Sequence, residues 1–170
     1  MAEEDKTKTL NRLLIDSART DNVDQLVKEV FSEVGKFDIN YQDGIGNTAL
    51  HYAAKEGSLD VLNELLEYYG CDVDYTNNIE GATPLHLAVK IEEPELRALI
   101  VDSLLDAGAD PRIKDKEGHI AQDYVDENDK ETLIAFRRHL AQESISKGDI
   151  AEDYDDDDED FDGSGSDDEE

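Results

Sequence analysis

Residues 46–54 read GNTALHYAA, and residues 81–89 read GATPLHLAV. These two stretches share a glycine, a threonine, a leucine and a histidine at the same relative positions, and His51 and His86 are 35 residues apart. Each stretch leads to a pair of leucines and then to a Gly-x-Asp triplet, at residues 70–72 and 108–110. Self-similarity at a period of about 20 to 50 residues is the signature of stacked repeats. The two stretches therefore predict a repeat architecture.

The same stretches predict where helices begin. Thr48 and Thr83 each precede a run of apolar residues at helical spacing, the place where a helix N-cap is favoured. Pro84 then takes the first helical position, where its missing N–H costs nothing. Leu50 and Leu85 fall on the apolar side of these short helices, and neighbouring alanines let a second helix approach closely. One helix pair cannot enclose a core alone, so such repeats must stack.

Two weaker copies of the pattern flank the central pair. Residues 13–21 begin with a leucine pair and lead to Asp-Ile-Asn at 38–40, and residues 115–121 carry the Asp-x-x-Gly turn before the match becomes polar. Polar substitutions are expected in terminal repeats, because each shows one face to water. Taken together, the glycine, the Thr-Pro-Leu-His run and the Gly-Ala-Asp triplet at these spacings resemble the ankyrin repeat.

The resemblance implies an all-α solenoid of about four helix-turn-helix repeats with finger loops. The repeats are expected at residues 10–42, 43–76, 77–114 and 115–142, within a domain that covers residues 10–148. Residues 1–9 are expected to form a flexible N-terminus, and residues 149–170 a disordered acidic tail. In the third repeat Glu92 replaces the usual glycine and extra residues follow, so the second helix is predicted to begin at Pro94.

The net charge of the chain limits the classes of partner that it can bind. The 170 residues include 45 Asp and Glu but only 16 Lys and Arg, which gives a formal net charge of −29. Such a chain repels nucleic acid and anionic membranes, so we expect neither as a direct partner. The single cysteine, Cys71, excludes an internal disulfide and suits a reducing compartment. With an acidic, polar start rather than a secretory signal, the sequence indicates a cytoplasmic and nuclear protein.

The residues that could carry chemistry have structural explanations. His51 and His86 fall on the histidine of the repeat, where the resemblance implies a hydrogen bond to the adjacent finger backbone. No Cys/His cluster accompanies them, and no nucleophile motif or phosphate loop occurs in the sequence. Cys71 replaces the alanine of the Gly-Ala-Asp triplet and is expected to pack as a small apolar residue. We therefore expect no enzyme, no cofactor and no metal site.

The resemblance implies binding of proteins through the fingertips and the outward residues of each first helix. Carried over by position, the candidate contact residues are Arg19, Thr20, Tyr41, Gln42, Gly44, Ile45, Asn47, Lys55, Glu56, Tyr75, Ile79, Glu80, Ala82, Lys90, Ile91, Lys114, Lys116, Glu117 and His119. Ile45, Ile79 and Ile91 stand out, because an isoleucine at an exposed tip has no structural use.

The acidic tail has two interpretations. It holds 14 acidic residues in 22 and no Lys or Arg, so it either keeps the protein in solution or acts as a polyanion for a basic protein. The residues assigned to the polyanion are Tyr154, Asp155, Asp156, Asp157, Asp158, Glu159, Asp160 and Phe161. Ser164 and Ser166 each have an acidic residue three positions later, which makes them candidate phosphorylation sites for acidic-directed kinases.

Two functions follow as hypotheses. The combination of small size, few repeats and an acidic ending is similar to that of small fungal ankyrin proteins that escort a basic ribosomal protein. We therefore predict a chaperone or escort for a basic client such as a ribosomal protein or a histone, monomeric when free. The alternative is a regulatory subunit or inhibitor that binds the surface of an enzyme, as ankyrin cell-cycle inhibitors do.

Overall fold

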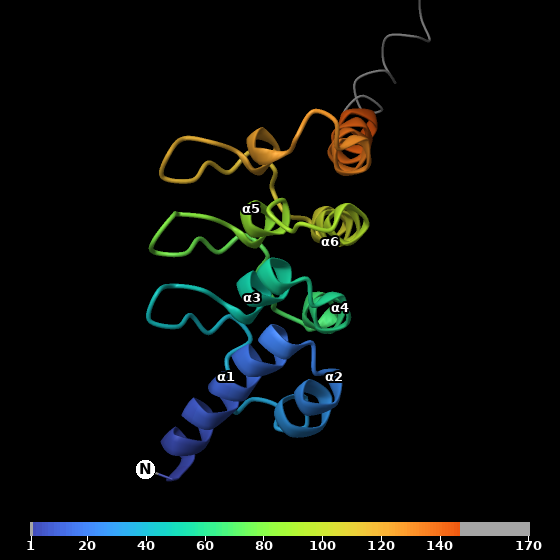
Figure 1. The fold of residues 1–170 in the computed structure, drawn as a ribbon. Helices are drawn as coiled ribbons and strands as arrows, with labels where there is room; N and C mark the ends of the chain where they lie inside the picture. Colours follow the sequence, from blue (N-terminus) through green and yellow to red (C-terminus); the bar gives the residue numbers. More distant parts are fainter. Residues whose placement is uncertain (1, 147–170) are drawn as a thin grey trace, which may run out of the picture. The chain divides into compact units, whose positions relative to one another are not determined.

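The computed structural model describes residues 2–146, which form pairs of helices joined by loops (Figure 1). The elements are α1 (Ala2–Thr20), α2 (Val23–Gln25), the π-helix η1 (Leu26–Phe31), α3 (Ala49–Glu56), α4 (Leu59–Glu67), α5 (Pro84–Ala88), α6 (Pro94–Asp106) and the 3₁₀ helix η2 (Ala121–Tyr124). Residues 130–146 are also helical. Within residues 2–146 no strand occurs, and the one β-bridge joins Lys114 to Ile120. The all-α prediction is confirmed.

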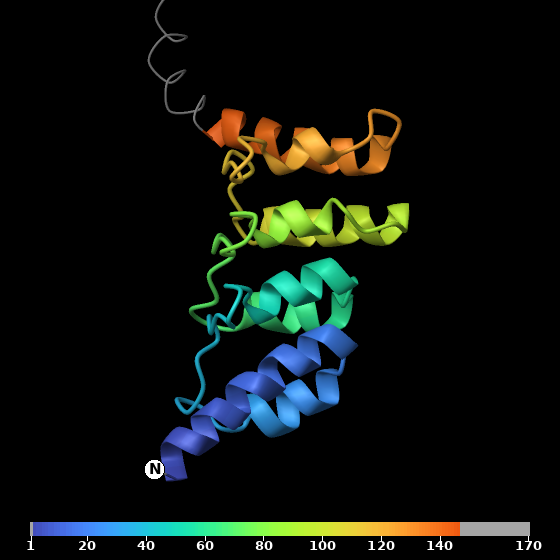
Figure 2. The ribbon, with the colours of Figure 1, turned by 60° about the vertical axis from the view of Figure 1, so that its left-hand side comes forward.

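Residues up to Phe136 form one compact unit, in which the helices stack in two columns. Figure 1 shows α1, α3 and α5 in one column, with α2, α4 and α6 beside them in the other, and Figure 2 shows the helix pairs stacked one above the next. The core lies between the columns and includes Leu14, Leu50, Leu85 and Leu104, all buried. Three loops project to one side of the first column: finger 1 (residues 41–48), finger 2 (75–83) and finger 3 (113–120).

The two central repeats start their helices through the same cap. The Thr48 side chain accepts a hydrogen bond from the His51 backbone, and the Thr48 N–H donates to His51 Nδ1 at 3.0 Å. Thr83 and His86 repeat this capping box, with Pro84 in the first turn of α5. Since Nδ1 accepts, Nε2 carries the proton and donates across to the next repeat. His51 Nε2 reaches the Ala82 carbonyl at 3.0 Å, and His86 Nε2 reaches the His119 carbonyl at the same distance.

Because this arrangement buries a neutral His51, the stability of the fold should depend on pH. Burial lowers the pKa of His51 from 6.5, more than the Ala82 carbonyl and Asp43 raise it. Below about pH 6.5 the His51 imidazole binds a proton in the unfolded chain but not in the folded chain. Stability should therefore fall as the pH drops from 7.5 to 5.5. For one proton the slope is at most about 1.4 kcal/mol per pH unit. Urea unfolding of wild type and His51→Gln over this range checks it, and an identical slope for both would contradict it.

The third repeat departs from its neighbours as its sequence indicated. Helix α6 begins at Pro94, and the Glu93 side chain caps it by accepting from the Glu95 and Leu96 backbone. Helix α5 stops at Ala88, and its C-cap is Val89 rather than a glycine. Ile91, predicted to be exposed, is only 9% exposed and belongs to the core. Its N–H donates to the Ala88 carbonyl at 3.2 Å, and Ile91 is therefore removed from the candidate contact residues.

The N-terminus also differs from the prediction. Residues 2–9, expected to be flexible, form the first turns of α1. Three acidic residues in the first turn favour the positive end of the helix dipole, and Lys6 pairs with Glu33 at 2.9 Å. The acidic tail at 149–170, the residues of its proposed polyanion from Tyr154 to Phe161, Ser164 and Ser166 lie outside the described residues.

Candidate functional site

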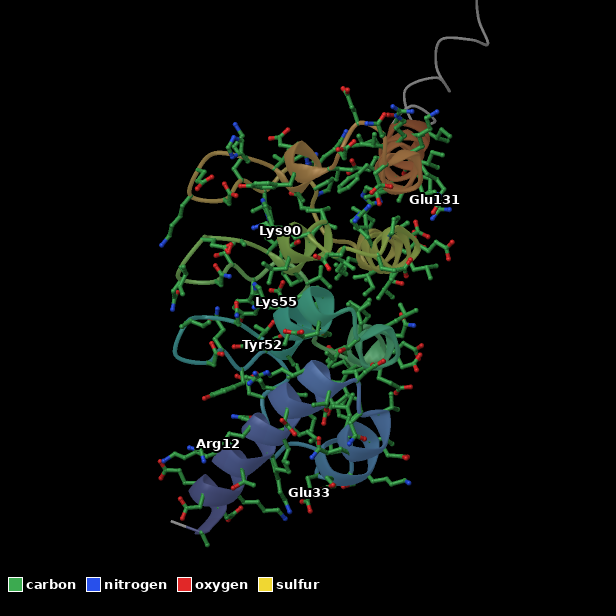
Figure 3. The ribbon with its side chains drawn as sticks, in the orientation of Figure 1. Arg12, Glu33, Tyr52, Lys55, Lys90 and Glu131 are labelled. Atoms are coloured by element: carbon green, nitrogen blue, oxygen red, sulfur yellow. The ribbon has the colours of Figure 1, made fainter. Side chains whose placement is uncertain are left out.

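The inner face of the repeat array is formed by the finger side of α1, α3 and α5 together with the three fingers. Figure 3 shows Arg12, Tyr52, Lys55 and Lys90 following one another along this face, from α1 towards finger 3. Glu131 lies on the side of the second helices instead. The inner face therefore carries basic and aromatic side chains from successive repeats.

Most of the candidate contact residues are accessible. The exposed ones are Arg19, Thr20, Gln42, Gly44, Ile45, Lys55, Glu56, Ile79, Lys90, Lys114, Lys116, Glu117 and His119, and Tyr41, Tyr75 and Glu80 are half-buried. Two further candidates are buried. Asn47 is 5% exposed, because its side chain accepts from Asn77 Nδ2 at 3.1 Å and links fingers 1 and 2. Ala82 is buried, and its carbonyl accepts a hydrogen bond from His51 Nε2. Neither of these two offers a side chain to a partner.

One hollow, of about 580 Å³, lies between α1, α3 and finger 1 and is called hollow 1. Its lining residues are Thr9, Arg12, Leu13, Ile15, Asp16, Arg19, Tyr41, Asp43 and Tyr52. Arg19 lies over the Tyr52 ring, 5.5 Å from its centroid, and the Tyr52 hydroxyl donates to Asp43 at 2.5 Å. Sequence reasoning found only Arg19 and Tyr41 in this hollow. Of the residues it missed on α1, Thr9 and Arg12 lie outside the recognisable repeat motif.

A second hollow, of about 390 Å³, lies between fingers 1 and 2 and is called hollow 2. Its lining residues are Ile45, Asn47, Lys55, Asn77, Ile79, Glu80, Leu87 and Lys90. All but Asn77 and Leu87 were candidates from the sequence, so the fold brings these six together. The remaining candidates, which line neither hollow, are Thr20, Gln42, Gly44, Glu56, Tyr75, Ala82, Ile91, Lys114, Lys116, Glu117 and His119.

The two hollows differ in the residue type at the position after the repeat histidine. In the second repeat it holds Tyr52, whose hydroxyl bonds the finger carboxylate Asp43. In the fourth repeat Tyr124 bonds Asp115 in the same way, which lowers the pKa of Asp115 to about 2 and raises the pKa of Tyr124 to about 12. In the third repeat the position is Leu87, which has no hydroxyl. Hollow 2 therefore has an aliphatic wall where the neighbouring repeats have a polar pair.

Backbone hydrogen bonds hold the fingers at fixed spacing. The Asn78 N–H donates to the Ile45 carbonyl at 2.9 Å, and the Lys116 N–H donates to the Glu80 carbonyl at 2.9 Å. The Lys116 ammonium also donates to the Asn78 carbonyl. Lys116, a candidate contact residue, therefore helps to hold fingers 2 and 3 together. The two isoleucines of hollow 2 therefore stand on fingers that a backbone hydrogen bond joins.

The described residues carry neither a metal-binding cluster nor an ionised thiol. Among residues 2–146, no group of three or more His, Cys, Asp or Glu side chains is placed to hold a metal ion. Cys71 is half-buried, and burial raises the pKa of its thiol to about 11, which keeps it protonated. No helix in this part of the chain is long and apolar enough to cross a membrane. What the inner face offers is recognition of another molecule by charge and apolar contact.

Comparison with known proteins gives the same family for most of the chain. A family model described as ankyrin repeats in three copies matches residues 14–115. The ankyrin repeat-containing protein YGL242C of Saccharomyces cerevisiae is 35% identical over 136 residues, which cover 74% of this chain and 75% of the yeast protein. The E3 ubiquitin-protein ligase hecd-1 of Caenorhabditis elegans is 31% identical over 114 residues, and palmitoyltransferase Hip14 of Drosophila melanogaster is 40% identical over 82 residues. These matches cover 67% and 48% of this chain, but only 4% and 12% of the two enzymes.

Proposed function

The chain belongs to the ankyrin-repeat family, and from the distribution of its charge we propose that it escorts a strongly basic client, such as a ribosomal protein or a histone. Ankyrin repeats are protein–protein interaction modules, so the chain is a binding module. The escort role refines that statement. We place this role in the cytoplasm and the nucleus, with the free chain as a monomer.

The observation that carries the proposal is the concentration of acidic residues on helices α4 and α6 and after residue 148. Helix α4 has three acidic residues, Asp60, Glu64 and Glu67, and no Lys or Arg. Helix α6 has one basic residue, Arg97, which is bonded to Asp129 at 2.7 Å. The sequence adds 14 acidic residues after residue 148. A basic client is attracted to such a surface from a distance and is shielded from other polyanions once bound.

The alternative is a regulatory subunit that binds an enzyme surface. The hydrogen bonds between neighbouring fingers favour it, because a preorganised surface suits a folded partner. A basic partner that aggregates when alone supports the escort, whereas a folded, neutral enzyme supports the alternative. Affinity purification at low salt followed by mass spectrometry separates them by the identity of the partner.

Removing the tail tests the basic client directly. Truncation after Gly148 should slow association with a purified core histone about tenfold at low salt and flatten the salt dependence of the rate. Dissociation should change less, because long-range attraction acts mainly on encounter. Surface plasmon resonance of both chains at two salt concentrations measures this. Unchanged kinetics at both concentrations would leave the tail as a solubility device and remove the main support for a basic client.

A further inference from the structure

The linings of the two hollows reverse the charge of the molecule. Residues 1–146 contain 31 acidic and 15 basic side chains, yet the two hollows are lined by four basic and three acidic ones. Two of those three acids already have partners. Asp43 accepts from the Tyr52 hydroxyl, and Glu80 pairs with Lys90 at 3.3 Å. An anion is therefore repelled less at these two hollows than the charge of the whole molecule suggests.

Lys55 is the basic group best placed to receive that anion. Within residues 2–146 its ammonium has no ion pair and no hydrogen bond, although acidic residues outnumber basic ones by two to one there. Lys90, which also lines hollow 2, lies 5.0 Å from the centroid of Tyr124 besides its pair with Glu80. An incoming carboxylate can bind Lys55 without breaking any contact and can share Lys90.

Besides these lysines, the hollow has three aliphatic lining residues, Ile45, Ile79 and Leu87. Ile45 is 42% exposed and Ile79 is 62% exposed, each on its own fingertip. Leu87, the leucine that replaces the tyrosine of the neighbouring repeats, forms the wall behind them. The hydrogen bond from Asn78 to Ile45 keeps the two tips together, so the hollow exists before a partner arrives. Exposed isoleucines that line a preformed hollow are suited to hold one apolar side chain.

We propose that hollow 2 binds an extended acidic segment of a partner protein, with an apolar side chain between Ile45, Ile79 and Leu87 and flanking carboxylates on Lys55 and Lys90. This goes beyond the escort of a basic client, because it uses another face and the opposite charge. It rests on the family's protein-binding role alone. The chain then has two sides, an acidic one for a basic region and the inner face for an acidic one.

The test measures binding of short labelled peptides to the full chain by fluorescence polarisation. The probe is a peptide of aspartate and glutamate with one central leucine, and its controls carry a central serine or replace the acids by lysine. The leucine peptide should bind at least tenfold more tightly than either control. Equal binding of the leucine and serine peptides, or preferred binding of the lysine peptide, would overturn the proposal.

Variants locate the binding. Lys55→Glu and Ile79→Asp should each weaken binding of the leucine peptide at least tenfold. Both side chains are exposed, so the fold should tolerate the changes. The matched control is Lys130→Glu, the same charge reversal at an exposed lysine outside both hollows. An equal loss in Lys130→Glu would show that only net charge matters and would overturn the site.

The same variants distinguish a partner segment in hollow 2 from a second copy of this chain. Analytical ultracentrifugation of the full chain should show a monomer. A dimer that Lys55→Glu dissociates would replace the partner segment by a second copy of this chain and so overturn the assignment. Failure of the histone experiment leaves this result unaffected, because the peptides and the variants address a different face.

Discussion

Leu85→Ala should lower the free energy of unfolding by about 2–5 kcal/mol, the usual cost of removing a buried leucine together with the cavity that remains. Leu85 is 1% exposed at the start of α5, between α3 on one side and η2 on the other. A repeat array gains most of its stability from interfaces between neighbours. The cavity left by Leu85→Ala therefore weakens two interfaces, and the unfolding transition should also broaden as the repeats lose cooperativity.

Leu99→Ala is the matched control for this experiment. Leu99 lies in α6 but is 54% exposed, so the same truncation should cost less than about 1 kcal/mol. Urea unfolding followed by circular dichroism gives both values. Equal costs at Leu85 and Leu99 would contradict the stacking of α5 between its neighbours.

The local parts of this fold could be read from the sequence because short-range chemistry decides them. Thr48 and Thr83 cap their helices whatever surrounds them, since the cap needs only the three residues that follow. Pro94 marks the start of α6 for the same reason, because its ring suits only the first turn. The repeat histidines followed from the family pattern, and the structure places their Nε2 atoms on the finger carbonyls.

The candidate site was harder to predict, because exposure depends on contacts between repeats. Asn47 and Ile91 both occupy surface positions in the repeat pattern, but both are buried. A side-chain bond to Asn77 draws Asn47 inward, and the early end of α5 turns Ile91 into the core. Leu87, in contrast, lines hollow 2 but was not among the candidate residues. Its importance appears only beside Tyr52 and Tyr124, whose hydroxyls bond the finger carboxylates.

The largest effect on the inner face is expected from Gly46→Ala. Gly46 has φ +84°, and a Cβ there would lie 2.7 Å from the backbone nitrogen of Asn78. The left-handed backbone costs a non-glycine residue about 1–3 kcal/mol. Because the obstacle is backbone, finger 2 must move away and break the bond from Asn78 to Ile45. An orphaned backbone group adds about 1–3 kcal/mol, so the total loss of stability should reach about 2–6 kcal/mol.

Gly118→Ala separates the two contributions. Gly118 has φ +87°, but a Cβ there would meet nothing within 4 Å, so this variant carries the backbone strain alone. Its cost, measured by urea unfolding, should be about 1–3 kcal/mol, and the excess at Gly46 is then the energy that couples fingers 1 and 2. Gly46→Ala should also weaken the acidic leucine peptide several-fold, since Ile45 and Ile79 lose their fixed spacing, whereas Gly118→Ala should not. If both variants cost the same and bind alike, the fingers are not coupled, and hollow 2 is not formed in advance of its partner.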